Sequence, residues 1–282
     1  MRRLIVCSVL VVSVLALGAR ADAMTSSSTV DGDATPAVVT FLGQVTDPTT
    51  DAVQLCSGTL VSPTVVVTAS HCVALFDDVA ISRILVSNDP APDPDGDGIV
   101  HLASLQHLSS VRSLHLNPGY KEAVGTDRYR EDVSAVVVAD PAALSRLGGV
   151  AYPQLPSPGV LDRLQATKAL ATTPFTVMGY GTEQKADGGP PAFPDSGQRR
   201  SAVLYAGSLN PQWVHQSQKV KAATGGACYG DSGGPSFLGG PSDRTLVAVT
   251  STGDIPCWST NVASRVDRAS VLAFLAPILA AG

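Results

Sequence analysis

The stretch GGACYGDSGGP, residues 225–235, carries the strongest functional signal in the sequence. Glycine is favoured where the backbone needs a positive φ or passes close to another segment, so the stretch predicts a tight, exposed loop. Such a loop can hold the Ser232 hydroxyl outward while the amides of Gly230 and Ser232 converge on one point. That is the arrangement of a nucleophile with its oxyanion hole, and an ordinary Gly/Ser turn is the alternative. The glycines around the serine are Gly226, Gly230, Gly233 and Gly234.

The composition predicts a folded chain without a nucleic-acid partner. With 44% hydrophobic and 15% charged residues, the 282-residue chain can bury one large core or two modest ones, and disorder is not expected. The formal net charge of -5 offers no basic surface for phosphate backbones.

The first 23 residues have the three parts of an export signal. Arg2 and Arg3 precede an apolar run, residues 4–17, and Ala21-Asp22-Ala23 supplies the small residues at which signal peptidase cleaves. We expect cleavage after Ala23 and a secreted, extracellular chain of residues 24–282 with no membrane partner. The apolar run is shorter than the roughly 20 residues that span a bilayer. A buried N-terminal helix is the alternative, and the choice between the general and the twin-arginine export route stays open.

Export makes the cysteines informative. Cys7 leaves with the signal peptide, and an even set of four remains in an oxidising compartment. Three pairings are possible, and short loops favour Cys56 with Cys72 and Cys228 with Cys257. A four-cysteine zinc site is the alternative, although no CxxC pair supports it.

Most of the chain is expected to form short strands. Runs rich in Val, Leu, Ile and Thr are separated by Pro, Gly, Asp and Ser clusters, which is typical of all-β barrels or sandwiches. Helical periodicity is clear only near the C-terminus, where Asp267 can cap a helix and Pro277 disturbs it. The Pro/Gly-rich residues 153–159 can join two β halves. The expected strands are residues 37–45, 59–69, 81–86, 133–139, 175–179, 201–206 and 245–250.

Two further stretches carry candidate chemistry. In LVSPTVVVTASHC, residues 60–72, an apolar strand delivers His71 beside Cys72, and a disulfide there pins the backbone next to the imidazole. In EDVSAVVV, residues 131–138, Asp132 opens an apolar strand, so a buried carboxylate there needs a donor such as an imidazole N–H. Taken alone, His71 could be a structural or surface histidine and Asp132 an ordinary residue at a strand start.

Together these stretches resemble the signatures of the chymotrypsin/trypsin-like serine proteases, in particular bacterial secreted members. CSGTLVSPTVVVTASHC (residues 56–72), DVSAVVV (132–138) and ACYGDSGGP (227–235) stand in the family's order of His, then Asp, then Ser. The cysteine spacings agree, and Ser251-Thr252-Gly253 lies where the family has its substrate-binding edge strand. The resemblance covers nearly all of the chain after residue 30.

The resemblance implies an all-β fold of two antiparallel six-stranded barrels with the active site between them. The barrels are expected at about residues 30–150 and 160–265, with a helix at about 267–276 packed outside. The implied partners are protein or peptide substrates, and a monomer is expected.

The resemblance also implies a role for each site residue. Ser232 attacks the scissile carbonyl, His71 accepts and returns the proton, and Asp132 orients the imidazole. The amides of Gly230 and Ser232 bind the oxyanion, and no metal or organic cofactor takes part. Gly226 lies on the pocket floor, where members that cleave after Arg or Lys carry aspartate, so an uncharged medium or large side chain is expected instead. The implied pocket residues are Gly226, Tyr229, Ser251, Gly253 and Asn261.

The chain also departs from the family pattern. The usual Ile-Val-Gly-Gly start after a basic residue is here TVDG, residues 29–32, with no Lys or Arg before it. Either another cleavage frees Val30 to pair its amino group with Asp231, or the site is assembled without that ion pair. Ser70 replaces the alanine usual before the histidine, and Thr252 replaces a common tryptophan; both are expected to be tolerated.

The acidic insertion NDPAPDPDGDG, residues 88–98, has the D-x-D-x-DG spacing of a calcium loop at Asp93, Asp95 and Asp97. The bidentate glutamate of such a loop is missing, because Ser104 stands at its position. A solvated acidic turn is therefore the preferred interpretation, and no metal is expected.

Two other function classes fit parts of the sequence. A catalytically silent binding protein on the same fold would need a damaged triad, whereas all three residues are present. An α/β-hydrolase esterase would show G-x-S-x-G, which residues 230–234 fit, but it would place Asp and His after Ser. The chain order therefore favours the protease.

Overall fold

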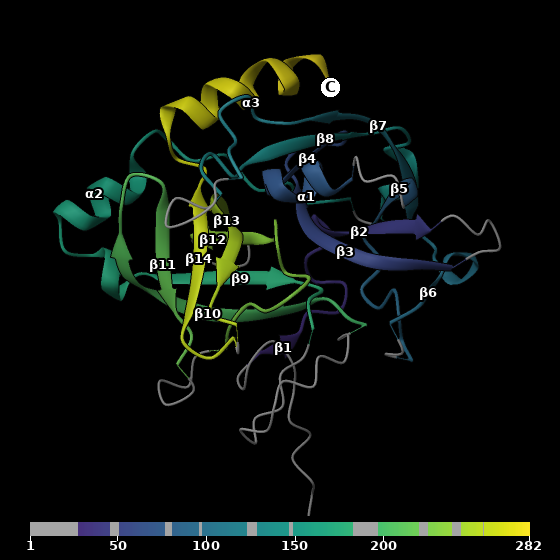
Figure 1. The fold of residues 1–282 in the computed structure, drawn as a ribbon, viewed down its shortest axis with the longest axis horizontal. Helices are drawn as coiled ribbons and strands as arrows, with labels where there is room; N and C mark the ends of the chain where they lie inside the picture. Colours follow the sequence, from purple (N-terminus) through teal and green to yellow (C-terminus); the bar gives the residue numbers. More distant parts are fainter. Residues whose placement is uncertain are drawn as a thin grey trace, which may run out of the picture.

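Two antiparallel barrels lie side by side, and the long helix α3 (Ala269–Ala281) runs along one side of them (Figure 1). The expected signal peptide, residues 1–23, falls outside the described part of the chain. The computed structural model describes residues 28–45, 51–76, 81–95, 98–122, 129–146, 149–182, 197–219, 225–238, 244–255 and 257–282.

The N-terminal barrel is a closed ring of six strands. Their order around the ring is β2-β5-β7-β8-β4-β3, and pairing of β2 with β3 closes it. The short strand β6 (Val100–His101) adds to the end of β3. Side chains alternate between the two faces of each strand, so one set fills the barrel interior. The six strands are β2 (Val38–Val45), β3 (Asp51–Leu60), β4 (Val65–Thr68), β5 (Ile81–Ser87), β7 (Leu108–His115) and β8 (Ser134–Val138).

The C-terminal barrel closes in the same way. Its order is β10-β11-β14-β13-β12-β9, and pairing of β10 with β9 closes the ring. The short strand β1 (Thr29–Val30) pairs with the start of β10. The predicted fold of two six-stranded barrels is therefore confirmed. The strands are β9 (Pro174–Gly179), β10 (Arg200–Leu209), β11 (Trp213–Ser217), β12 (Pro235–Leu238), β13 (Thr245–Gly253) and β14 (Thr260–Arg265).

One predicted strand is wrong. Residues 59–69 do not form a single strand, because the chain turns between Leu60 and Val65 and the two halves pair with each other. The Ser62 hydroxyl accepts a hydrogen bond from Val65 N at 3.0 Å, which stabilises the turn. A serine and proline inside an apolar run are the sequence features that mark it.

The predicted end and cap of the last helix are also corrected. Helix α3 runs through Pro277 to Ala281 instead of ending near residue 276. Ile278 packs into the core with Val271 and Leu275, and this burial offsets the backbone hydrogen bond that a proline removes. Asp267 does not cap α3, because its carboxylate accepts hydrogen bonds from Leu161 N and Arg265.

The remaining helical segments are short. None of the described helices is long and apolar enough to cross a membrane. They are α1 (Ser70–Leu75), α2 (Val160–Ala166) and the 3-10 turns η1 (Leu102–Ser104), η2 (Ala142–Leu144) and η3 (Leu170–Thr172).

The barrels meet through a shared core and through hydrogen bonds. Val38 and Val65 of the first barrel share a buried cluster with Met178 of the second and with α3. Ser57 of β3 links the barrels directly, because its hydroxyl donates to Gly230 O at 2.9 Å and its amide donates to the carbonyl of residue 232 at 2.8 Å. The interface therefore fixes the predicted nucleophile loop against β3.

Candidate active site

His71 and Asp132 are brought together by two neighbouring strands. His71 lies in the first turn of α1, which follows β4, and Asp132 lies just before β8, the strand paired with β4. His71 Nδ1 is 2.9 Å from Asp132 Oδ2, and the His71 backbone amide donates to Oδ1 at 2.8 Å. The Asp132 carboxylate is fully buried, whereas 19% of the His71 side chain is exposed. Asp132 thus holds the His71 imidazole through Nδ1, which leaves Nε2 available to another partner.

A third hydrogen bond ties the carboxylate to the other barrel. Ser251 of β13 is buried, and its hydroxyl donates to Asp132 Oδ2 at 2.5 Å. The sequence predicted a substrate-binding role for Ser251 and did not predict this contact. Asp132 therefore receives hydrogen bonds from both barrels.

Ser232 lies in a tight turn just before β12, as the glycine pattern predicted. Gly230 and Gly233 have φ values of +88° and +80°, where glycine is strongly favoured. A Cβ atom on Gly233 would lie 2.0 Å from Thr68 Oγ1 and 2.5 Å from Ser57 O. The loop therefore packs without a gap against β3 and β4, the strands that lead to His71.

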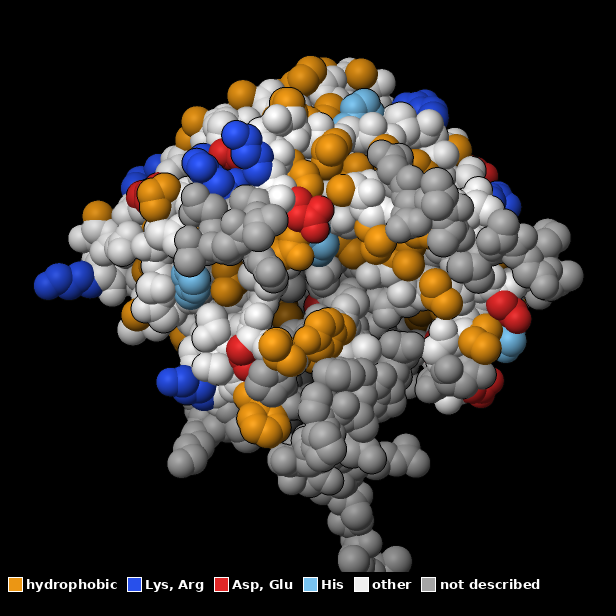
Figure 2. Space-filling model, viewed as in Figure 1, with side chains coloured by type: hydrophobic (Ala, Val, Ile, Leu, Met, Phe, Trp, Pro, Cys, Tyr) orange, Lys and Arg blue, Asp and Glu red, His pale blue; other side chains and the backbone are white. Residues whose placement is uncertain are grey.

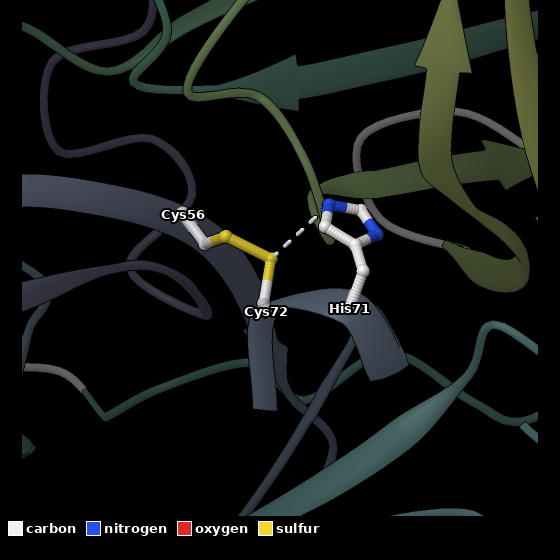
Figure 3. Close-up of side chains that lie close together, drawn as sticks. All are labelled: Cys56, His71 and Cys72. Carbon is white, nitrogen blue, oxygen red and sulfur yellow. Dashed lines mark hydrogen bonds between the residues drawn. A yellow bond between two sulfur atoms is a disulfide. The ribbon is translucent and has the colours of Figure 1, made fainter. Parts of the chain in front are cut away.

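His71 and Ser232 line one cavity of about 320 Å³ between the barrels. In the view of Figure 2 the surface is hollowed near its middle, and hydrophobic side chains border the hollow. Within the described residues no hydrogen bond joins the two side chains, and His71 Nε2 lies 3.7 Å from Cys72 Sγ (Figure 3). Contacts between a nucleophile and its base commonly tighten only when substrate binds.

The residues of the expected oxyanion hole are anchored by β3. The Gly230 carbonyl accepts hydrogen bonds from Ser57 Oγ at 2.9 Å and from Gln54 Nε2 at 3.0 Å. The Ser232 carbonyl accepts one from Ser57 N at 2.8 Å. The sequence predicted neither of these contacts, because the partners of Gln54 and Ser57 lie in the other barrel.

Asp231 is a buried carboxylate with no cation beside it among the described residues. It is fully buried, and its two oxygens accept hydrogen bonds from Gly181 N and Cys228 N, each at 2.8 Å. Burial raises the pKa of Asp231 to about 7, although the two amides act to lower it. No Lys, Arg or His pairs with it in the described stretches, and Val30 is instead part of β1, paired with Arg200.

The predicted pocket residues gather around the same cavity. Asn261 is buried, and its side-chain amide donates to Gln216 Oε1 at 2.8 Å. Gly226 is buried directly before Ala227, which lines the cavity. The predicted residues that line the cavity are Tyr229, Ser251, Gly253 and Asn261.

The comparison with known families agrees with this geometry. The family model of Trypsin matches residues 30–272. The chain belongs to the trypsin family. It is a serine protease of the trypsin fold, and its substrates are peptides or proteins.

Both predicted disulfides of this trypsin-family chain are confirmed: Cys56–Cys72 and Cys228–Cys257. The first joins β3 to α1 beside His71, as Figure 3 shows. Potential ligand atoms of Cys56, His71 and Cys72 lie within 4.8 Å of one another, as in a metal site. Disulfide sulfurs are not thiolates, so this group does not fit a metal ion.

The expected calcium candidates of the trypsin-family chain are only partly described. Asp93 is buried and accepts a hydrogen bond from Gly98 N at 2.9 Å, and Asp95 is exposed. Asp97 lies outside the described residues. The predicted solvated turn is therefore wrong for Asp93, which is buried, and fits Asp95, which is exposed.

Tyr129 is a site residue that sequence reasoning missed. Its ring packs on the His71 ring with centroids 5.0 Å apart, and it lines the cavity. Its φ of +58° is unusual for a residue with a side chain. A single aromatic residue in a polar stretch gives no pattern from which this contact could be predicted.

Proposed function

We propose that this trypsin-family chain is a secreted serine endopeptidase in which Ser232 is the nucleophile, His71 the general base and Asp132 the residue that orients it. The observation that carries the proposal is the double hydrogen bond from His71, through Nδ1 and the backbone amide, to one fully buried carboxylate. This hold fixes the ring orientation and the tautomer with its proton on Nδ1. Nε2 is then able to accept a proton.

The reaction proceeds through an acyl-enzyme. His71 Nε2 accepts the hydroxyl proton of Ser232 as Oγ forms a bond to the substrate carbonyl carbon. The imidazolium gives that proton to the leaving amine when the C–N bond breaks, and the acyl group stays on Oγ. A water molecule then attacks the ester while His71 accepts its proton, and the proton returns to Ser232 Oγ as the acid product leaves. The Asp132 carboxylate stabilises the imidazolium in both steps.

The amides of Gly230 and Ser232 bind the oxyanion in this proposal. Ser57 supports it, because its hydroxyl and amide hold the carbonyls of both residues. Donors that are held in place before the reaction need no reorganisation when charge develops on the substrate oxygen.

We propose an uncharged medium or large side chain in the primary pocket. A buried Arg or Lys without a counter-ion is unfavourable by several kcal/mol, and Gly226 supplies no carboxylate. Asp254 is the acidic residue in the described cavity lining, and its carboxylate is occupied by hydrogen bonds from the amides of Trp258, Ser259 and Thr260.

The two disulfides support the proposed extracellular location, because disulfides persist in oxidising compartments. In this proposal residues 1–23 direct export, cleavage follows Ala23, and the mature protein acts as a monomer. Mass spectrometry of the secreted protein tests the cleavage position directly.

A fluorophosphonate probe tests the nucleophile. We expect labelling of the wild type and of Ser208→Ala, which removes an exposed serine from β10, and no labelling of Ser232→Ala. His71→Ala should lower kcat by about 10⁴-fold or more. Labelling that persists in Ser232→Ala refutes the nucleophile assignment. A correctly folded wild type that neither reacts with the probe nor cleaves any peptide favours the alternative, a catalytically silent binding protein on the same fold.

A peptide library tests the pocket. The wild type should cleave after uncharged residues, and Gly226→Asp should raise kcat/KM for substrates with Arg or Lys before the scissile bond. Gly226→Asn is the matched control, since it adds similar volume without charge. A wild type that prefers Arg or Lys contradicts the proposed specificity.

A further inference from the structure

Two buried serine hydroxyls lie behind the His71–Asp132 pair. Ser70 opens α1 and immediately precedes His71, and Ser134 opens β8, two residues after Asp132. Both serines are fully buried, and their Oγ atoms are 2.7 Å apart. Because members of the family usually have alanine before the histidine, the Ser70 hydroxyl plays no part in the mechanism derived above.

The hydrogen bonds around these hydroxyls have one consistent direction. Each hydroxyl has a single proton, and Ser70 donates its proton to Glu131 O at 3.0 Å. The proton between the two hydroxyls must therefore come from Ser134, which in turn accepts a hydrogen bond from Asn117 N at 2.9 Å. A continuous chain runs from Asn117 N through both hydroxyls to the carbonyl of Glu131, and neither hydroxyl is left unsatisfied.

The chain of hydrogen bonds ends at Glu131, a residue with a strained backbone. Glu131 has φ +51°, a conformation that is unfavourable for a residue with a Cβ and persists only when its surroundings hold it. Val133 N also donates to its carbonyl, at 2.8 Å, and Arg268 Nη1 donates to its carboxylate at 2.5 Å. Glu131 is thus held by residues of α1, of the segment before β8 and of the segment before α3, and β8 lies beside both α1 and α3 (Figure 1). Because Glu131 precedes Asp132 in the chain, the contacts that fix Glu131 also fix the backbone at Asp132.

We propose that Ser70 and Ser134 are positioning residues for the catalytic pair, an inference that rests on the proposed function. The bond from Ser70 Oγ to Glu131 O runs beside the bond from His71 N to Asp132 Oδ1, so two adjacent residues of α1 are tied to two adjacent residues before β8. The hydroxyls keep the imidazole and the carboxylate aligned through the backbone and do not touch the substrate.

Kinetics of Ser70→Ala, Ser134→Ala and the double variant test the proposal. Each single variant should lower kcat about threefold to tenfold with KM unchanged, because one hydrogen bond of the alignment is lost. The double variant should be little worse than either single variant, since the two hydroxyls act as one unit. Ser109→Ala is the matched control: it removes a buried hydroxyl of the same barrel that donates to Ser110 O and accepts from Asp140 N. The control should keep kcat within about twofold of the wild type.

A second readout does not depend on turnover. In the Ser232→Ala background, the downfield NMR resonance of the proton between His71 Nδ1 and Asp132 should shift or broaden in Ser70→Ala and stay unchanged in Ser109→Ala. Equal kcat and equal spectra for Ser70→Ala and Ser109→Ala overturn the positioning role. Failure of the wild type to react with the fluorophosphonate probe overturns the proposed function instead, while the spectra still test the hydroxyl pair.

Discussion

Raising the pH from about 4 to about 8 should destabilise the folded chain through Asp231. The carboxylate is fully buried between two backbone amides, and burial raises its pKa from 3.8 to about 7. Below the unfolded value both states hold the proton, so the ionisation of Asp231 does not change the free energy of unfolding there. Between the two values the unfolded chain releases the proton and the folded chain keeps it, so the free energy of unfolding falls with pH and the loss is complete above about pH 7.

The size of the loss follows from the shift. About three pKa units correspond to about 4 kcal/mol, a large part of the stability of a typical domain. Asp231→Asn cannot titrate, so its free energy of unfolding should fall by about 4 kcal/mol less than that of the parent over the same range. We expect the variant to be less stable than the parent at low pH, because its side-chain NH2 faces one of the two backbone N–H donors. The difference in the free energy of unfolding between the variant and the parent should therefore narrow as the pH rises.

Urea unfolding at pH 4, 5, 6, 7 and 8 measures this difference, with Ser232→Ala as the parent so that self-digestion does not interfere. Asp95→Asn removes an exposed carboxylate and should leave the pH dependence unchanged. A difference that stays constant or widens with pH refutes the reasoning, since it shows that the pKa of Asp231 is not raised in the folded chain. A cation that reaches the carboxylate has this effect. The amino group of Val30, freed by cleavage, is the cation to look for in that case, by N-terminal sequencing of the same preparation.

Three further predictions concern the catalytic region. Ser251→Ala removes a hydrogen bond to Asp132 and should lower kcat about tenfold at constant KM in steady-state assays, whereas an unchanged kcat contradicts its role. Gly230→Ala places a Cβ 3.0 Å from the Gly181 backbone at φ +88° and should lower kcat about 10²-fold by displacing an oxyanion donor; a near-normal rate argues against that donor. Replacing Cys56 and Cys72 by serine removes a cross-link between residues 16 apart in the sequence. The free energy of unfolding, measured by calorimetry, should fall by about 3 kcal/mol, and an unchanged value would mean that the disulfide is absent.

The parts of the fold that could be predicted are those whose strands are apolar. Strand β8 is buried throughout and stands out as a run of valines, so it was predicted in full, with one extra residue at each end. Strands β11 and β14 were missed because polar residues occupy buried positions in them. Gln216 and Asn261 are both buried and satisfy each other by a hydrogen bond, which hydrophobic periodicity does not detect.

The same distinction applies to the site: features with a local signal could be predicted, and contacts between distant segments could not. The glycine pattern around Ser232 indicated a nucleophile loop from local backbone requirements, whereas His71 and Asp132 became candidates only together with it, through the family resemblance. The structure places His71 against Asp132 and places His71 and Ser232 at one cavity. The contacts made by Ser57 and Ser251 could not be predicted, since each joins the two barrels across a large separation in the chain. Helix α1 was missed as well, because a segment of six residues without a side-chain cap depends on its disulfide and on the barrel behind it.

The position of α3 has a consequence for incomplete chains. Its side chains Val271, Leu275 and Ile278 complete a core that contains Val65 and Val133, contributed by a part of the polypeptide made much earlier. A fragment that stops before residue 269 therefore keeps the three residues of the proposed triad and still exposes the apolar surface that α3 covers. Quality-control proteases should recognise such a fragment, so truncated products should be degraded rather than accumulate as active enzyme.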